Sequence, residues 1–116
     1  RHMMRKVVTD GTGGKADIPG FGVMGKTGTA EKPSNGGYDR KSLVTSFVAA
    51  FPHSDPRYVL IVSLDEPKPV EGTYGYATAG WNAAPTAGKI IERIGPMLPG
   101  ARDIPKHASI RQEVLR

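Results

Sequence analysis

Four consecutive residues, Lys26-Thr27-Gly28-Thr29, combine groups that could bind and transform an anionic substrate. Lys26 offers a fixed positive charge, and the hydroxyls of Thr27 and Thr29 can donate hydrogen bonds to a carboxylate. Gly28 has no side chain to obstruct an approaching surface. If this stretch forms an edge strand, a free backbone amide can also stabilise an oxyanion in acyl transfer, an effect of roughly 3 kcal/mol per donor. The sequence therefore predicts a binding strand here.

The same lysine also fits a second pattern. Gly20, Gly25, Lys26 and Thr27 satisfy G-x-x-x-x-G-K-[ST], the loop whose backbone amides wrap nucleotide phosphates. Later in the chain an apolar stretch ends in Asp65, as do the strands that hold magnesium in nucleotide-binding enzymes. One lysine cannot serve both kinds of site, so the local backbone must decide between them.

A phosphate loop needs a helix that begins at the Lys-Thr pair, because the first turn of that helix points its amides at the anion. Gly28, Pro33 and Gly36-Gly37 follow too soon to leave room for such a helix. Residues 11–17, which should form the strand before the loop, are polar and rich in glycine. Asp65 equally fits the end of a plain hairpin. An extended strand is the favoured prediction, and a nucleotide site is the unfavoured alternative.

Composition and charge argue against nucleic-acid, metal and cofactor sites. The chain has 116 residues, with 16 Lys and Arg against 11 Asp and Glu, and a net charge of +5. No basic run is interleaved with aromatic residues, so we expect no nucleic-acid partner. Cysteine is absent, and His2, His53 and His107 are far apart in the sequence. We therefore expect neither a metal site nor a cofactor.

Short elements are expected around the binding strand. Apolar residues at helical spacing stop at residues 10–14, so the chain should open with the end of a helix. Residues 22–32 should form the strand of Lys26, and residues 33–37 should break it. The chain begins with Arg rather than Met, and we expect it to be a piece of a longer polypeptide.

Two apolar segments, residues 43–51 and 58–64, are separated by a turn with two prolines and predict an antiparallel hairpin. Both segments are apolar nearly throughout, so we expect cover on both faces of the sheet. A helix should run from Ala84 to the Gly95-Pro96 pair. One face of this helix should pack on the sheet through Ala87, Ile90, Ile91 and Ile94.

These elements predict an α+β fold, a three-stranded antiparallel sheet packed by a C-terminal helix. We expect residues 1–99 to form the folded portion. Residues 100–116 have only one brief apolar pattern and no clear partner, so we expect a loosely held C-terminal tail.

Lys26-Thr27-Gly28-Thr29 also matches the third motif of the serine acyl-transferases that react with penicillin. The surrounding segments MRKVVTDGTGGKADIPGFGVMGKTGTAEKP, SFVAAFP and YVLIVSLDEP, with residues 74–80 before AAP and a helix, resemble the C-terminal end of class B penicillin-binding proteins. The resemblance covers residues 3–98. Within the family, the chain most resembles the division-specific transpeptidase that builds septal peptidoglycan.

The resemblance implies a penicillin-binding-protein and β-lactamase-like transpeptidase fold. It also implies a stem peptide ending in D-Ala-D-Ala that acylates a serine, after which the acyl group passes to an amine of a neighbouring stem peptide. β-Lactams mimic the donor peptide. Lys26 would belong to the hydrogen-bond network of the nucleophile, Thr27 and Thr29 would bind the carboxylate, the Thr29 amide would form half of the oxyanion hole, and Gly28 would keep the cleft open.

The chain departs from the family in lacking two motifs. No serine has a lysine three positions later, so S-x-x-K is absent, and so is S-x-N. We expect an upstream part of the same polypeptide to supply both motifs, and the isolated chain to be inactive and unlabelled by penicillin. A non-catalytic module of the same ancestry, which binds peptide or a partner protein, remains an alternative that the upstream sequence would distinguish.

The residues before the last helix also differ from relatives, which often have Gly-Gly where this chain has Gly75-Tyr76. Tyr74, Tyr76 and Trp81 could line the rim of the cleft and bind substrate, or could pack the loop onto the domain. By the same resemblance, we expect a location on the periplasmic side of the bacterial inner membrane, with the anchor outside this chain. Divisome proteins are then candidate partners.

Overall fold

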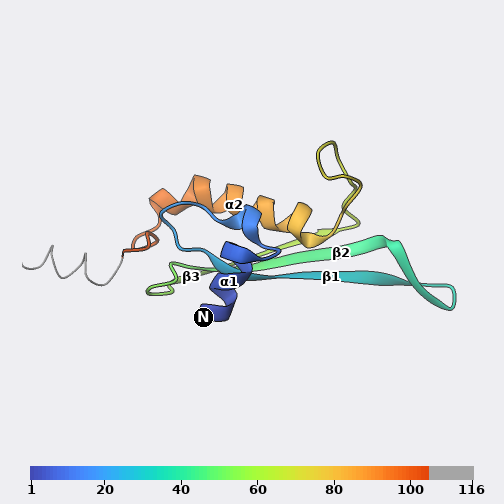
Figure 1. Ribbon diagram of the computed structural model, residues 1–116, viewed down its shortest axis with the longest axis horizontal. Helices are drawn as coiled ribbons and strands as arrows, with labels where there is room; N and C mark the ends of the chain where they lie inside the picture. Colours follow the sequence, from blue (N-terminus) through green and yellow to red (C-terminus); the bar gives the residue numbers. More distant parts are fainter. Residues whose placement is uncertain (105–116) are drawn as a thin grey trace, which may run out of the picture.

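The computed structural model describes residues 1–104 (Figure 1). Its helices and strands are α1 (His2–Asp10), β1 (Met24–Ser34), β2 (Gly37–Phe51), β3 (Tyr58–Asp65) and α2 (Ala83–Ile94). The strands form one antiparallel sheet in the order β1-β2-β3, which leaves β1 at an edge. The predicted α+β fold, with three antiparallel strands and a packed helix, is confirmed.

The first two strands are longer than predicted. Residues 33–37 were expected to break the chain, but Pro33 pairs with Tyr38 and Ser34 with Gly37. Proline is tolerated here because β1 is an edge strand, where a missing amide costs no ladder hydrogen bond. Gly36 adopts a φ of 80° in the tight turn that joins the strands, a conformation that glycine reaches without a steric penalty.

The core lies on one face of the sheet, where both helices pack. Phe47 and Phe51 of β2 contribute its large aromatic side chains, Val8 comes from α1, and Ile91 from α2. Most of the predicted stripe on α2 faces this core: Ala87 and Ile91 are buried and Ile90 is partly buried, whereas Ile94 is exposed. The packing fixes α2, and with it the loop before α2, against the sheet.

The opposite face of the sheet is open in the part of the chain that the structure describes. Val59 and Ile61 of β3 are 71% and 65% exposed, so the expectation of cover on both faces is wrong for residues 1–104. The reason is that α1 and α2 contribute to the same core cluster. Because Lys26 pairs with Val48, and Val48 with Ile61, Lys26 lies on this open face.

The segment after α2 is held to the domain at its start. Ala101 is buried, the amide of Asp103 donates to the carbonyl of Gly20 at 2.8 Å, and the Asp103 carboxylate accepts from the amide of Ser54 at 3.0 Å. Residues 105–116 lie outside the described residues, so a loose tail over 100–116 stays a prediction. No helix within residues 1–104 combines the length and apolar character needed to cross a bilayer.

Candidate functional site

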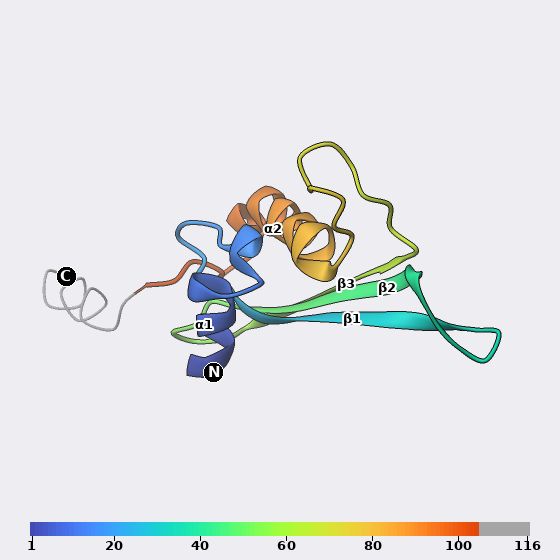
Figure 2. The same ribbon diagram turned by 45° about the vertical axis from the view of Figure 1, so that its right-hand side comes forward.

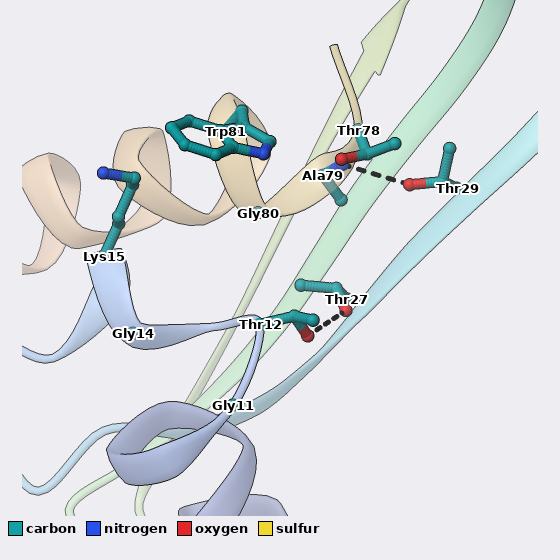
Figure 3. A pocket seen from close by; sticks show the side chains of 10 residues that line it. All are labelled: Gly11, Thr12, Gly14, Lys15, Thr27, Thr29, Thr78, Ala79, Gly80 and Trp81. Atoms are coloured by element: carbon teal, nitrogen blue, oxygen red, sulfur yellow. Dashed lines mark hydrogen bonds between the residues drawn. The ribbon is translucent and has the colours of Figure 1, made fainter. Parts of the chain in front are cut away.

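A cleft of about 390 Å³ lies beside β1, on the face that carries the core (Figure 3). Three segments form its walls: the loop after α1, residues 11–15; alternate residues of β1, Thr27 and Thr29; and the turn before α2, residues 78–81. These segments are far apart in the sequence, so the packing of both helices on the sheet is what brings them together.

Thr27 and Thr29 lie on the same face of β1 because successive side chains of a strand alternate. The hydroxyl of Thr27 shares a hydrogen bond of 2.8 Å with the hydroxyl of Thr12 (Figure 3). The hydroxyl oxygen of Thr29 accepts a hydrogen bond of 3.0 Å from the amide of Ala79. The hydroxyl proton of Thr29 is not used in that bond, so it can be donated to an anion in the cleft.

Thr12 is a site residue that the sequence analysis missed. Residues 10–14 were interpreted only as the end of a helix, although they contain a hydroxyl between glycines. The turn at Gly80 comes so close to this loop that a Cβ on residue 80 would lie 2.7 Å from the Thr12 carbonyl oxygen. Because Gly80 has no side chain, the two loops can meet and enclose the cleft.

Asn82 holds the loop before α2 in place. Its Oδ1 accepts hydrogen bonds from the hydroxyl of Thr45 at 2.8 Å and from the amide of Ala83 at 2.7 Å, which caps α2. Its Nδ2 donates to the carbonyl of Ala77 at 2.7 Å. One side chain therefore links the central strand, the helix and the loop that carries Ala79.

Lys26 is placed differently from the two threonines. Its side chain is exposed, and Nζ donates to the carbonyl of Thr27 at 2.9 Å. Gly28 shares its face of the strand, and a Cβ on residue 28 would lie 2.9 Å from the Ser46 hydroxyl. The extended strand through Lys26 and Thr27 leaves no helix N-terminus for a phosphate, so the nucleotide-loop alternative is wrong.

The aromatic residues form a cluster at the rim of the cleft. Tyr76 stacks on Trp81 with ring centres 5.7 Å apart, and Tyr74 meets Trp81 edge-on at 6.0 Å. The Lys15 ammonium lies 5.0 Å from the centre of the Trp81 ring. Tyr74 and Tyr76 remain 85% and 57% exposed, so they contact the loop and also present surface to solvent.

The described residues include no group of three or more His, Cys, Asp and Glu side chains that could hold a metal ion. Lys15, at the mouth of the cleft, is the cation among its lining residues. The arrangement of one cation with hydroxyls and amides suits a carboxylate or an oxyanion.

Comparison with known proteins adds an independent line of evidence. Residues 1–92 match the family described as penicillin binding protein transpeptidase domain. Over 94 residues the chain is 50% identical to the probable peptidoglycan D,D-transpeptidase FtsI of Caulobacter vibrioides. This alignment covers 76% of this chain and 16% of that protein. The chain is also 39% identical over 98 residues to stage V sporulation protein D of Bacillus subtilis, in an alignment that covers 84% of this chain and 14% of that protein.

Two solved structures are similar in fold. The transpeptidase domain of penicillin-binding protein 3 from Burkholderia pseudomallei has a TM-score of 0.72 and 36% identity, over 90% of this chain and 30% of that one. Penicillin-binding protein 3 of Mycobacterium tuberculosis, complexed with aztreonam, has a TM-score of 0.71 and 29% identity, over 90% of this chain and 25% of that one. The chain thus spans only a minor part of each relative. It belongs to the penicillin-binding protein transpeptidase family, as its strand of Lys26, Thr27 and Thr29 predicted.

Proposed function

We propose that this chain supplies one wall of the active site of a serine D,D-transpeptidase that crosslinks peptidoglycan stem peptides in septal cell-wall synthesis and binds β-lactams. The observation that carries the proposal is the placement of Thr27 and Thr29, whose hydroxyls enter a cleft from an edge strand. An edge strand offers unpaired backbone groups to an extended peptide, and the hydroxyls beside it offer donors to a terminal carboxylate.

Each residue of the motif has a role in this proposal. Thr27 and Thr29 bind the carboxylate of the terminal D-Ala or of a β-lactam, and the amide of Thr29 forms half of the oxyanion hole. Lys26 joins the hydrogen-bond network of the nucleophile. Gly28 has no side chain and so keeps the face of the strand that it shares with Lys26 open. In the reaction a serine oxygen bonds to the carbonyl carbon of the penultimate D-Ala, the terminal D-Ala leaves as its amine, and an amine of a second stem peptide then displaces the serine.

The nucleophile and its base come, in this proposal, from an upstream part of the same polypeptide that carries S-x-x-K and S-x-N. The open face of the sheet supports this arrangement, because Lys26 lies on the same face as the exposed Val59 and Ile61, two strands away with Val48 between Lys26 and Ile61. A segment that covered these side chains could bring a serine close to Lys26. The isolated chain is therefore inactive in acyl transfer.

The aromatic rim contributes to substrate binding in the same proposal. Trp81 lines the cleft of Thr27, and Tyr76 stacks on its ring, so Tyr74 and Tyr76 extend the apolar surface beyond the cleft. Stem peptides and β-lactams are the proposed ligands, and divisome proteins are proposed partners of the complete protein. The site works on the periplasmic side of the inner membrane, with the anchor outside this chain.

A non-catalytic binding module of the same ancestry is the second candidate. The observation that favours it is the cleft of Thr27 and Thr29, which offers hydroxyls to a peptide carboxylate whether or not a nucleophile is nearby. Such a module would keep the cleft and bind peptides without acylation. The sequence upstream of this chain distinguishes the candidates, because only an enzyme requires S-x-x-K and S-x-N there.

The decisive experiment measures acylation of the full-length protein by a fluorescent penicillin. Thr27→Val and Thr29→Val each remove one hydroxyl while preserving shape, and we expect each to slow acylation by about tenfold or more, as loss of a hydrogen bond to a charged group does. Thr9→Val, on the exposed surface of α1, is the matched control and should leave the rate unchanged. Unaltered acylation of a Thr27→Val, Thr29→Val double variant would contradict the proposed site.

A further inference from the structure

The cleft of Thr27 continues along β1 into a longer groove. Thr29 and Thr78 line both this cleft and a second hollow, which extends to Tyr38 and Arg40. Arg40 and Thr78 in turn line both the second hollow and a third one, which lies beneath the loop between β3 and α2. This loop leaves β3 beside the bend in β2 (Figures 1 and 2). The three hollows therefore form one path from the cleft, past Thr29 and Arg40, to the loop between β3 and α2.

A bulge in β2 creates the far end of this path. Glu31 pairs with Leu43, but the next residue, Lys32, pairs with Asp39, so residues 40–42 have no partners on β1. The Asp39 carboxylate stabilises the bulge by accepting hydrogen bonds from the amide of Lys41 at 2.9 Å and from the hydroxyl of Ser42 at 2.7 Å. Bulges commonly re-aim side chains beside functional sites, and this one brings Arg40 and Lys41 to the groove.

Positive charge gathers at this end of the groove. Arg40, Lys41 and Lys68 line it, and none of these three forms an ion pair with any residue within 1–104. Three acidic residues lie nearby, and one of them, Glu66, follows β3 and forms an ion pair with Lys32 at 3.4 Å. Asp39 is occupied by its bonds to the bulge, and Glu31 lines the adjoining hollow. We call Arg40, Lys41 and Lys68 the cationic arm.

We propose that the cationic arm binds a second carboxylate on the peptide substrate, upstream of the terminal carboxylate that Thr27 and Thr29 hold. This inference rests on the proposed function, because that function sets the position of the terminal carboxylate. The bulge begins opposite Glu31 and Lys32, which are two and three residues beyond Thr29 on β1. At 3.3 Å per residue, the bulge therefore lies about 7 to 10 Å from Thr29 along the strand. An extended peptide antiparallel to β1 would place a side chain two or three residues before its terminus at the arm.

The chemistry of the arm favours a peptide carboxylate. An arginine guanidinium holds a carboxylate through two parallel hydrogen bonds, and Lys41 and Lys68 add charge without imposing geometry. Leu43 and Tyr76 line the same hollow, so the methylene groups of an acidic side chain would contact apolar surface while its charge reaches the cations. The arm thus acts as a specificity element and takes no part in the acyl transfer.

The test compares two synthetic peptides that end in D-Ala-D-Ala and carry either glutamate or glutamine two residues before the terminal D-Ala. A second pair carries the variable residue one position earlier. With the full-length protein, we expect kcat/KM to favour glutamate in at least one pair by about twofold to fivefold at low salt, typical of partly exposed charge pairs. This preference should shrink as ionic strength rises, because salt screens the interaction.

Variants separate the arm from the rest of the site. Arg40→Gln and Lys68→Gln should each bring the glutamate-to-glutamine ratio toward one, and Glu31→Gln should raise it. Lys89→Gln, an exposed lysine on α2, is the matched control and should leave the ratio unchanged. A cooperative melting transition like that of the unaltered protein shows that each variant is folded.

The outcomes are distinguishable from those of the proposed function. If penicillin does not acylate the full-length protein, the transpeptidase proposal fails. If acylation and peptide turnover occur but no glutamate preference is seen, or Arg40→Gln leaves the preference intact, the cationic arm fails alone. Binding of the protein to anionic lipid vesicles that is lost in Arg40→Gln, with peptide selectivity unaltered, would also overturn the inference.

Discussion

The hydroxyl of Thr45, fully buried on the central strand, donates a 2.8 Å hydrogen bond to Oδ1 of Asn82, 37 residues later in the sequence. This bond joins the sheet to the loop that forms one wall of the cleft. The same loop delivers the amide of Ala79 to Thr29. The geometry of the site therefore depends on a residue that touches no ligand in the proposed mechanism.

Asn82→Ala should destabilise the domain by about 2 to 4 kcal/mol, because it removes the cap of α2 and leaves the Thr45 hydroxyl buried without a partner. Thr45→Val is the matched variant, and it should cost clearly less because Asn82 still caps the helix. Thermal unfolding of both variants checks the order. Equal losses would show that the cap contributes little and would contradict this account.

Gly80→Ala should widen the cleft and weaken the fold. Its new methyl group would lie 2.7 Å from the Thr12 carbonyl oxygen, so the two loops must separate. We expect a loss of about 1 to 3 kcal/mol in stability, typical of overpacking, together with slower penicillin acylation of the full-length protein. Gly37→Ala is the control, because no atom lies within 4 Å of its Cβ position. Equal effects of the two substitutions would refute close loop contact.

Most of the elements could be predicted from sequence because local signals define them. The helical spacing of the apolar residues Ala87, Ile90 and Ile91 predicted α2. Gly28 and Pro33, which disfavour a helix, predicted an extended strand after Lys26. The contact of Thr12 with Thr27 could not be predicted this way, because it depends on how two loops meet after the core has packed. The bulge at residues 40–42 was missed for a similar reason, since pairing register depends on both strands.

The open face of the sheet provides a prediction that separates the isolated chain from the complete protein. Ile61→Ser should change the stability of the isolated chain little, because this side chain is 65% exposed. In the full-length protein, where the proposed upstream segment covers Ile61, the same substitution should cost about 1.5 to 3 kcal/mol. Melting curves of both proteins provide the comparison. A small effect in both would mean that nothing covers this face, and the proposed placement of the nucleophile would fail.

The bulge that carries the cationic arm should loosen in acid. Hydrogen bonds from the Lys41 amide and the Ser42 hydroxyl lower the pKa of Asp39 below its usual 3.8, and the charges of Lys41 and Lys68 act in the same direction. A carboxyl group whose pKa is lowered by folding stabilises the folded state above its unfolded pKa. This contribution is lost as the pH falls through the lower, folded pKa. Hydrogen bonding in the bulge should therefore persist down to pH 3.8 and weaken only below it.

Two measurements check this expectation. The carboxyl carbon of Asp39, followed by NMR, should titrate with a midpoint below 3.8, and the protection of the Lys41 amide against hydrogen exchange, relative to its intrinsic rate at each pH, should fall over the same range. Asp39→Asn keeps an acceptor for the amide but has no carboxyl group to titrate, so its exchange should lack this step. A midpoint at or above 3.8 would mean that the carboxylate does not hold the bulge. The position of Arg40 at the end of the groove would then need another support.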